Sequence, residues 1–147
     1  MKPLERIQKV TARIVSRCGK YDYITDIMKD LHWLPIKQRI GFKIIMLTFR
    51  SLYGLAPSYL CELVHWHVPK RTLRSGNTYT LSIPNLSDVD ESTSKKFGKS
   101  KYFDRSFQYH APSTWNMLPL HIRTCSDFNT FKSFLKTHLF KISYSSE

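Results

Sequence analysis

Six positively charged residues near the N-terminus fall on one side of a predicted helix. At 100° per residue, they lie within roughly 80° of the helical wheel; they are Lys2, Arg6, Lys9, Arg13, Arg17 and Lys20. Cations along one helix face neutralise successive phosphate groups, and such contacts read charge rather than base sequence. Glu5 is the single acidic residue among the first twenty. We call these six cations the basic rail, and we expect it to bind a polyanion.

Two further groups of cations extend this pattern. Arg39, Lys43 and Arg50 fall within roughly 40° of one another on a second predicted helix. A third group, Lys70, Arg71 and Arg74, precedes a predicted strand. Each group is also compatible with an ordinary solvated surface. The predicted nucleic-acid-binding residues are Arg6, Lys9, Arg13, Arg17, Lys20, Arg39, Lys43, Arg50, Lys70, Arg71 and Arg74.

Several aromatic residues stand among these cations, as base-stacking surfaces require. They are Tyr21, Tyr23, Trp33, Trp66 and Tyr102. Packing in the core is the competing interpretation for most of them.

The sequence contains few residue patterns that would support metal binding or catalysis. Cys61, His65 and His67 offer three zinc ligands within seven residues, but no fourth ligand follows nearby, so we expect no metal. The sequence has no phosphate-binding glycine loop, nucleophile elbow or zinc-protease motif. Its acidic cluster, Asp88, Asp90 and Glu91, lacks the spacing of a calcium loop. We therefore predict a protein that is not an enzyme and uses no cofactor.

The net charge points to polyanions as partners, nucleic acid first and an acidic membrane surface second. The 147 residues include 23 Lys and Arg against 11 Asp and Glu, a formal charge of +12. Residues 1–50 hold 11 basic and 4 acidic residues, so the charge is concentrated there. The longest aliphatic run is far shorter than the ~20 residues of a membrane span. The three cysteines are odd in number and widely spaced, which is typical of reduced thiols, and the N-terminus has no apolar leader. We therefore expect a nuclear or cytoplasmic protein, neither secreted nor membrane-bound.

The elements that must position these residues are mostly helices. Apolar residues recur every three or four positions over residues 3–18, with Gly19 as the expected stop. The apolar stripe of this helix is expected to dock to the core. A short helix is expected from Thr25, as N-cap, to Leu31. Residues 35–53 predict a long helix that is apolar on nearly every side and therefore central and buried, ended by Gly54. Further helices are expected over residues 57–64 and 127–140.

The middle of the chain differs in character. Residues 78–83 alternate in β-branched and aromatic residues and predict a strand. Phe103, Arg105, Phe107 and Tyr109 indicate a second strand ended by Pro112, which pairs with the first as a hairpin around a mobile loop at 85–101. The predicted fold class is mainly α, a helical bundle around a central helix with a small β-hairpin insertion, or α+β by strict count. We expect a single domain over 1–147, with a basic helical part at 1–65, a strand and loop part at 66–112 and a C-terminal helical part at 113–147.

Six strings resemble the C-terminal tail region of reverse transcriptases from non-LTR, LINE-type, jockey-like retrotransposons. In chain order they are LERIQKVTARIV at 4–15, LHWLPIKQRI at 31–40, YGLAPSYL at 53–60, RTLRS at 71–75, DR, AP and WNMLP within 104–119, and FKSFLKTHLF at 131–140. The resemblance covers residues 4–140 in the family's order. The chain departs from the family pattern at Phe103, Ser106 and His110.

The resemblance implies a non-catalytic domain that holds RNA or DNA during target-primed reverse transcription. The family's catalytic carboxylates belong to segments that this sequence does not contain, so no active-site residue is carried over. Two alternatives stay open. One is a docking module that packs on the polymerase domain of the parent element, and the other is a decayed retroelement fragment without function.

Overall fold

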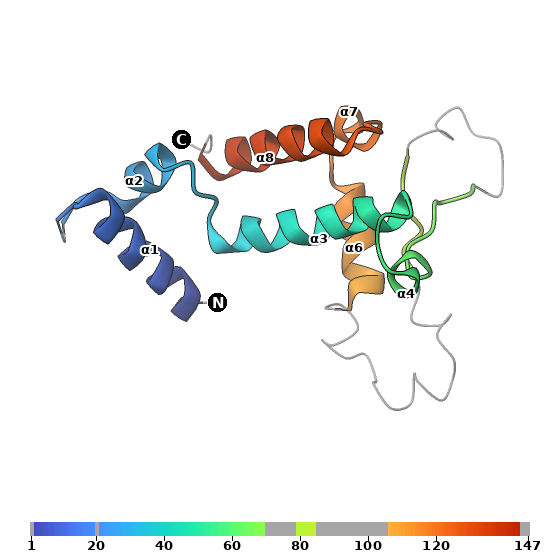
Figure 1. Cartoon of the computed structure of the whole chain (residues 1–147), viewed down its shortest axis with the longest axis horizontal. Coiled ribbons are helices and arrows are strands. Elements are labelled where there is room, and N and C mark those ends of the chain that lie inside the picture. The colour runs from blue at the N-terminus through green and yellow to red at the C-terminus, as the bar shows by residue number, and fades with distance from the viewer. Residues whose placement is uncertain (1, 20, 70–78, 85–105, 145–147) are drawn as a thin grey trace. The chain divides into compact units, whose positions relative to one another are not determined.

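A computed structural model describes residues 2–19, 21–69, 79–84 and 106–144. These residues are mainly helical, as the sequence predicts. In chain order the helices are α1 (Lys2–Ser16), α2 (Ile24–Asp30), α3 (Ile36–Leu52), α4 (Ser58–Cys61), α6 (Phe107–Asn116), α7 (Leu120–Arg123) and α8 (Phe128–Tyr144) (Figure 1). No helix in these ranges has both the length and the apolar character needed to cross a membrane.

The chain divides into two compact units. Unit 1 comprises residues 1–43 and 132–147, and unit 2 comprises residues 44–131. Unit 1 thus joins segments from the two ends of the sequence, whereas the expected parts 1–65, 66–112 and 113–147 are each continuous. Helices α3 and α8 contribute residues to both units.

Unit 2 is built around stacked aromatic rings. The ring of Phe49 in α3 lies 4.3 Å from that of Phe131 in α8, and Trp115 in α6 stacks on the same Phe131 at 5.6 Å. All three side chains are fully buried, together with Ile122 in α7. Because large aromatic side chains bury much apolar area, these rings contribute strongly to the stability of unit 2.

The second predicted strand is wrong, and with it the hairpin. Phe107 and Tyr109 lie in α6, which continues through Pro112, while Phe103 and Arg105 lie outside the described residues. A proline inside a helix removes one backbone hydrogen bond. Here Ala111, Pro112 and Trp115 on one face are buried, and this burial offsets the missing bond.

The first predicted strand is an extended segment with a different partner. Leu81 forms a single antiparallel bridge with Trp66, through hydrogen bonds from His67 N to Thr80 O and from Ser82 N to His65 O, both 2.9 Å. Its other neighbour is α6. Asn116 accepts from Leu81 N at 2.8 Å and donates to Leu81 O at 2.9 Å, and Trp115 Nε1 donates to Tyr79 O at 3.0 Å. These side-chain bonds take the place of the missing strand.

Three helices end with a residue in the left-handed region, where φ is 53° at Arg17, 52° at His32 and 66° at Gly54. In each case the next amide donates to the carbonyl five residues earlier, as in Leu55 to Arg50 at 2.8 Å. The prediction that Gly54 ends its helix is confirmed. The prediction that Gly19 ends α1 is wrong, because α1 ends at Ser16 and the Gly19 amide donates to Asp22 Oδ2 at 2.6 Å.

The boundaries of the shorter helices also differ from the prediction. The N-cap of α2 is Tyr23, and no side-chain hydrogen bond caps it, so the expected role of Thr25 is wrong. Helix α4 covers only Ser58–Cys61.

The long helix α3 is central only in its second half. Ile45, Thr48, Phe49 and Ser51 are buried, whereas Ile40 and Leu47 remain 38% and 40% exposed. The buried hydroxyls of Thr48 and Ser51 donate to the carbonyls of Ile44 and Leu47, each at 2.9 Å. The expectation that apolar residues all round imply burial all round is therefore wrong.

Helix α8 begins at a capping aspartate. Asp127 Oδ2 accepts a hydrogen bond from the Thr130 amide at 2.7 Å. This bond holds the pKa of the exposed Asp127 carboxyl below its usual value. Because the folded pKa is depressed, the contribution of this cap is present above the unfolded pKa and is lost as pH falls through the folded one.

We predict that Asn116→Ala destabilises unit 2 by about 1–3 kcal/mol, because the Leu81 amide and carbonyl both lose their partner. Urea unfolding followed by tryptophan fluorescence measures the change. Asn129→Ala, at an exposed position of α8, is the matched control and should change stability little. Equal stability of the two variants would show that the side-chain clamp on Leu81 contributes nothing.

Candidate nucleic-acid interface

Helix α1 carries Lys2, Arg6, Lys9 and Arg13 of the basic rail, whereas Arg17 directly follows the end of the helix and Lys20 lies outside the described residues. Lys2, Arg6, Lys9 and Arg17 are exposed. Arg13 is half-buried, and its Nη2 donates to the Asp22 carbonyl at 3.5 Å. Its Nε is buried and has no hydrogen-bond partner in the described part of the chain. Four cations of the rail are thus open to a ligand, and Arg13 is partly engaged within the chain.

The packing of α1 contradicts the predicted orientation. The residues buried on this helix are Gln8 and Ala12, which lie on a flank between the basic and apolar faces. The apolar residues are open instead, with exposed fractions of 54% at Leu4, 62% at Ile7 and 70% at Ile14. Ala12 packs with Ile27 and Met28 of α2, and small residues let the two helices approach closely. The expectation that the apolar stripe docks to the core is therefore wrong.

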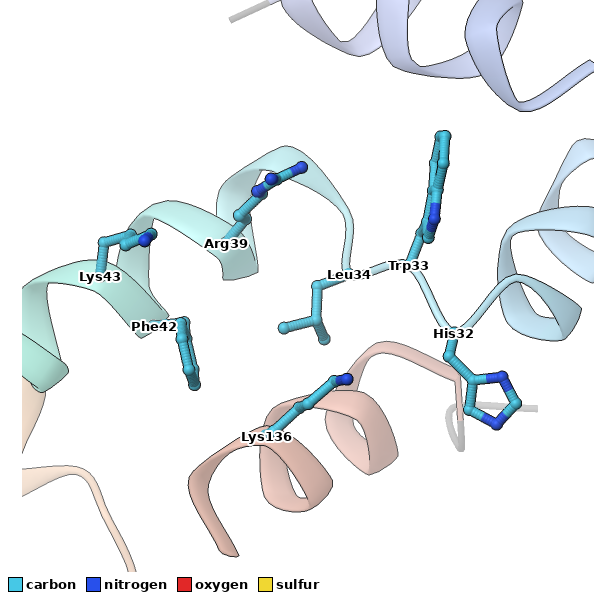
Figure 2. A pocket seen from close by; sticks show the side chains of 7 residues that line it. All are labelled: His32, Trp33, Leu34, Arg39, Phe42, Lys43 and Lys136. Atoms are coloured by element: carbon cyan, nitrogen blue, oxygen red, sulfur yellow. The ribbon is translucent and has the colours of Figure 1, made fainter. Parts of the chain in front are cut away.

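A pocket of about 310 Å³ lies in unit 1 beside the segment that joins α2 to α3 (Figure 2). We call it the linker pocket. Its lining residues are His32, Trp33, Leu34, Arg39, Phe42, Lys43 and Lys136. Three are cations and none is acidic. Arg39 and Lys43 come from α3, while Lys136 extends from α8 toward Leu34 in Figure 2.

Two side chains from distant parts of the sequence hold this linker. Gln8 Nε2 in α1 donates to the Leu34 carbonyl at 2.8 Å, and the Tyr144 hydroxyl in α8 donates to the Trp33 carbonyl at 2.5 Å. The ring of His32 stacks on Phe140 with centroids 5.8 Å apart. The linker backbone is thereby anchored from both α1 and α8.

Burial raises the pKa of the Tyr144 hydroxyl above its usual value. The proton is therefore held more tightly in the folded state. The stability that this group contributes is complete below the unfolded pKa of about 10 and falls as pH rises through the higher folded value. The anchor on Trp33 is intact at neutral pH.

The remaining predicted cations do not join this pocket. Arg50 belongs to unit 2, where its guanidinium lies 5.0 Å from the centre of the Phe128 ring. Lys20, Lys70, Arg71 and Arg74 lie outside the described residues. Of the second predicted group, the structure brings Arg39 and Lys43 together. The structure adds Lys136 to the same pocket. Sequence spacing could not predict this, because Lys136 is about 90 residues away from Lys43 along the chain.

The aromatic residues named with the cations divide into two kinds. Tyr21 and Tyr23 are 90% and 83% exposed, so core packing is wrong for these two. Trp33 is half-buried and packs in part against the cluster of Ala12, Ile27 and Met28. Trp66 is 40% exposed and meets the fully buried Trp115 edge to face at 6.3 Å. Tyr102 lies outside the described residues.

The candidate zinc ligands lie at the end of a short helix and on the extended segment that follows it. Cys61 ends α4, and its thiol donates to the Ala56 carbonyl at 3.4 Å. His65 and His67 are exposed on the segment that pairs with Leu81. Within the described ranges, no three His, Cys, Asp or Glu side chains gather closely enough to hold a metal ion.

Comparison with known proteins adds no relative. A scan against protein-family models, a search of curated proteins and a search of solved structures find no match to this chain.

We predict that Gln8→Ala destabilises the protein by about 1–3 kcal/mol, because the Leu34 carbonyl is buried with Gln8 and loses its donor. Thermal unfolding monitored by circular dichroism measures the effect, and each kcal/mol corresponds to roughly 3–5 °C for a chain of this size. Gln38→Ala, a half-exposed glutamine at the start of α3, provides the comparison. The same melting temperature for both variants would contradict the anchoring role of Gln8.

Proposed function

We propose that this chain is a non-catalytic nucleic-acid-binding domain that contacts phosphate groups with little sequence preference. The observation that carries the proposal is the basic rail, of which Lys2, Arg6 and Lys9 are exposed on one side of α1 and Arg17 is exposed directly after the end of this helix. The formal charge of +12 supports the same conclusion, since such an excess attracts polyanions over many ångströms.

The resemblance to the tail of LINE-type reverse transcriptases supplies the biological setting of the proposal. In that setting, the domain holds template RNA or target DNA near a polymerase during target-primed reverse transcription. The parent element's polymerase would perform the chemistry. This chain would contribute affinity and orientation alone, and we place it in the nucleus or the cytoplasm.

A second candidate function is docking on the polymerase domain of the parent element. The specific observation that favours it is the open apolar stripe of α1, formed by Leu4, Ile7, Val10, Ile14 and Val15, each about half exposed or more. An apolar helix face of this extent is typical of a surface that another protein covers. The two functions are compatible, because the stripe and the rail lie on different sides of α1.

We predict a steep salt dependence of nucleic-acid binding that originates in the rail. Replacing Lys2, Arg6, Lys9 and Arg17 by Gln should make the slope of log K against log salt shallower by about 3, at ~0.7–0.9 per phosphate contact. Fluorescence anisotropy with a labelled oligonucleotide between about 50 and 200 mM salt measures both slopes.

The matched control for the rail carries Gln at Lys29, Lys37, Lys132 and Lys141. These are four exposed lysines of unit 1 outside the rail. It removes the same charge from other surfaces and should retain most of the slope. Equal losses in the two variants would mean that net charge, rather than the rail, determines binding.

We predict that the apolar stripe makes the isolated chain bind hydrophobic dyes or self-associate. Leu4→Gln, Ile7→Gln and Ile14→Gln together should abolish both while leaving the melting temperature nearly unchanged, because these side chains bury little in the fold. Dye fluorescence and analytical ultracentrifugation measure the outcome. A melting temperature lowered by 10 °C or so would show that the stripe is buried by this chain itself and is no docking surface.

A further inference from the structure

Three positively charged residues line the linker pocket. Arg39, Lys43 and Lys136 are exposed and approach the pocket from two helices, and no Asp or Glu of the described residues lines it. An anion that binds among these three cations gains a favourable Coulomb interaction with each of them. A phosphate group suits this arrangement, because it offers several acceptor oxygens to donors from different directions.

The remaining wall of the pocket is aromatic and apolar. Trp33, Leu34 and Phe42 line it, and Trp33 keeps part of its surface open. In Figure 2, Trp33 and Arg39 extend to the same side of the linker. An inorganic anion or a carboxylate would satisfy the cations but would leave this wall exposed to water. The combination favours a ligand with a phosphate and a flat apolar ring.

The backbone anchors make the pocket a preformed site. Tyr144 and Gln8 hold the backbone carbonyls of Trp33 and Leu34, and the Trp33 side chain packs in part against the cluster of Ala12, Ile27 and Met28, so this wall is formed before any ligand arrives. Preorganisation lowers the entropy lost on binding. The volume of about 310 Å³ is in the range of small-ligand sites and admits one base with its phosphate.

We propose that the linker pocket binds one unpaired nucleotide of a single strand, with its phosphate at Arg39, Lys43 and Lys136 and its base against Trp33. The proposal rests on the proposed nucleic-acid-binding function and adds a preference that the rail lacks. The rail binds phosphate groups of single-stranded and double-stranded nucleic acid alike. The pocket requires an unpaired, unstacked base. In a duplex, such a base becomes available only when its base pair is broken, which costs free energy.

The test compares strands that differ only in their bases. A labelled deoxyuridine strand of about 12 nucleotides is compared with an abasic strand of the same phosphate count and with the same deoxyuridine strand paired to its complement. A uridine RNA strand forms a further arm, which separates RNA from DNA by the 2′-hydroxyl alone. The pocket variant carries Arg39→Gln, Lys43→Gln and Lys136→Gln, and its control carries Lys37→Gln, Lys132→Gln and Lys141→Gln on the same two helices. All six positions are exposed, and circular dichroism verifies that both variants fold.

We expect the unchanged protein to bind the deoxyuridine strand on the order of tenfold more tightly than the abasic strand, from stacking of one base. The pocket variant should lose that ratio. The control should weaken binding of both strands by the same factor and keep the ratio. On the duplex, the two variants should weaken binding alike.

Each other outcome overturns a defined statement. Equal affinity of the unchanged protein for the base-containing and abasic strands, with the salt slope preserved, overturns the pocket proposal and leaves the proposed function standing. A ratio that survives in the pocket variant places base recognition elsewhere and also overturns it. The absence of salt-dependent binding to every strand overturns both.

Discussion

Two backbone carbonyl groups between α2 and α3 impose the constraint on which unit 1 depends. The carbonyls of Trp33 and Leu34 lie outside any helix, and a buried carbonyl without a donor is costly. Tyr144 and Gln8 satisfy them, although they stand 111 and 26 residues away along the chain. Because Gln8 must reach Leu34, α1 turns its Gln8 and Ala12 flank toward the rest of unit 1. This contact and the packing of Ala12 against Ile27 and Met28 together set the orientation of the rail and the apolar stripe.

The same constraint gives α1 three distinct faces. One flank packs, one face carries cations, and one face is apolar and open. A helix that docked through its apolar stripe would hide that stripe and present only charge to its surroundings. As folded, α1 offers both a polyanion-binding surface and an apolar surface. This is why nucleic-acid binding and protein docking are compatible proposals for one short helix rather than competing ones.

Unit 2 contains an extended segment around Leu81 whose only strand-like partner among the described residues is a single bridge to Trp66. The backbone of Leu81 pairs with the segment around Trp66 on one side and with the amide of Asn116 on the other. An asparagine side chain carries the same donor and acceptor as a peptide group, so it can replace a neighbouring strand at one position. Trp115, the preceding residue, adds a bond to Tyr79 while its ring packs on Phe131. The adjacent Trp115 and Asn116 thus connect the extended segment to the aromatic core.

The sequence by itself determined the three long helices and the charge of the site. The periodicity of residues 3–18, 35–53 and 127–140 predicted α1, α3 and α8, and Gly54 marked the end of α3, because helix propensity and capping are local. Lys2, Arg6, Lys9 and Arg13 share a face of α1 because the geometry of a helix is regular, whereas Arg17 follows the end of the helix.

Only the tertiary structure decided which faces are used. The segment at Phe107 and Tyr109 alternates like a strand, yet burial of Ala111 and Trp115 makes it a helix. The apolar stripe of α1 predicted the packed face, yet the hydrogen bond from Gln8 to Leu34 and the close contact at Ala12 select the flank. Lys136 joins Arg39 and Lys43 through the approach of α8 to the start of α3, which no local pattern encodes. Charge and periodicity are properties of neighbouring residues, whereas burial and the satisfaction of distant backbone groups depend on the whole chain.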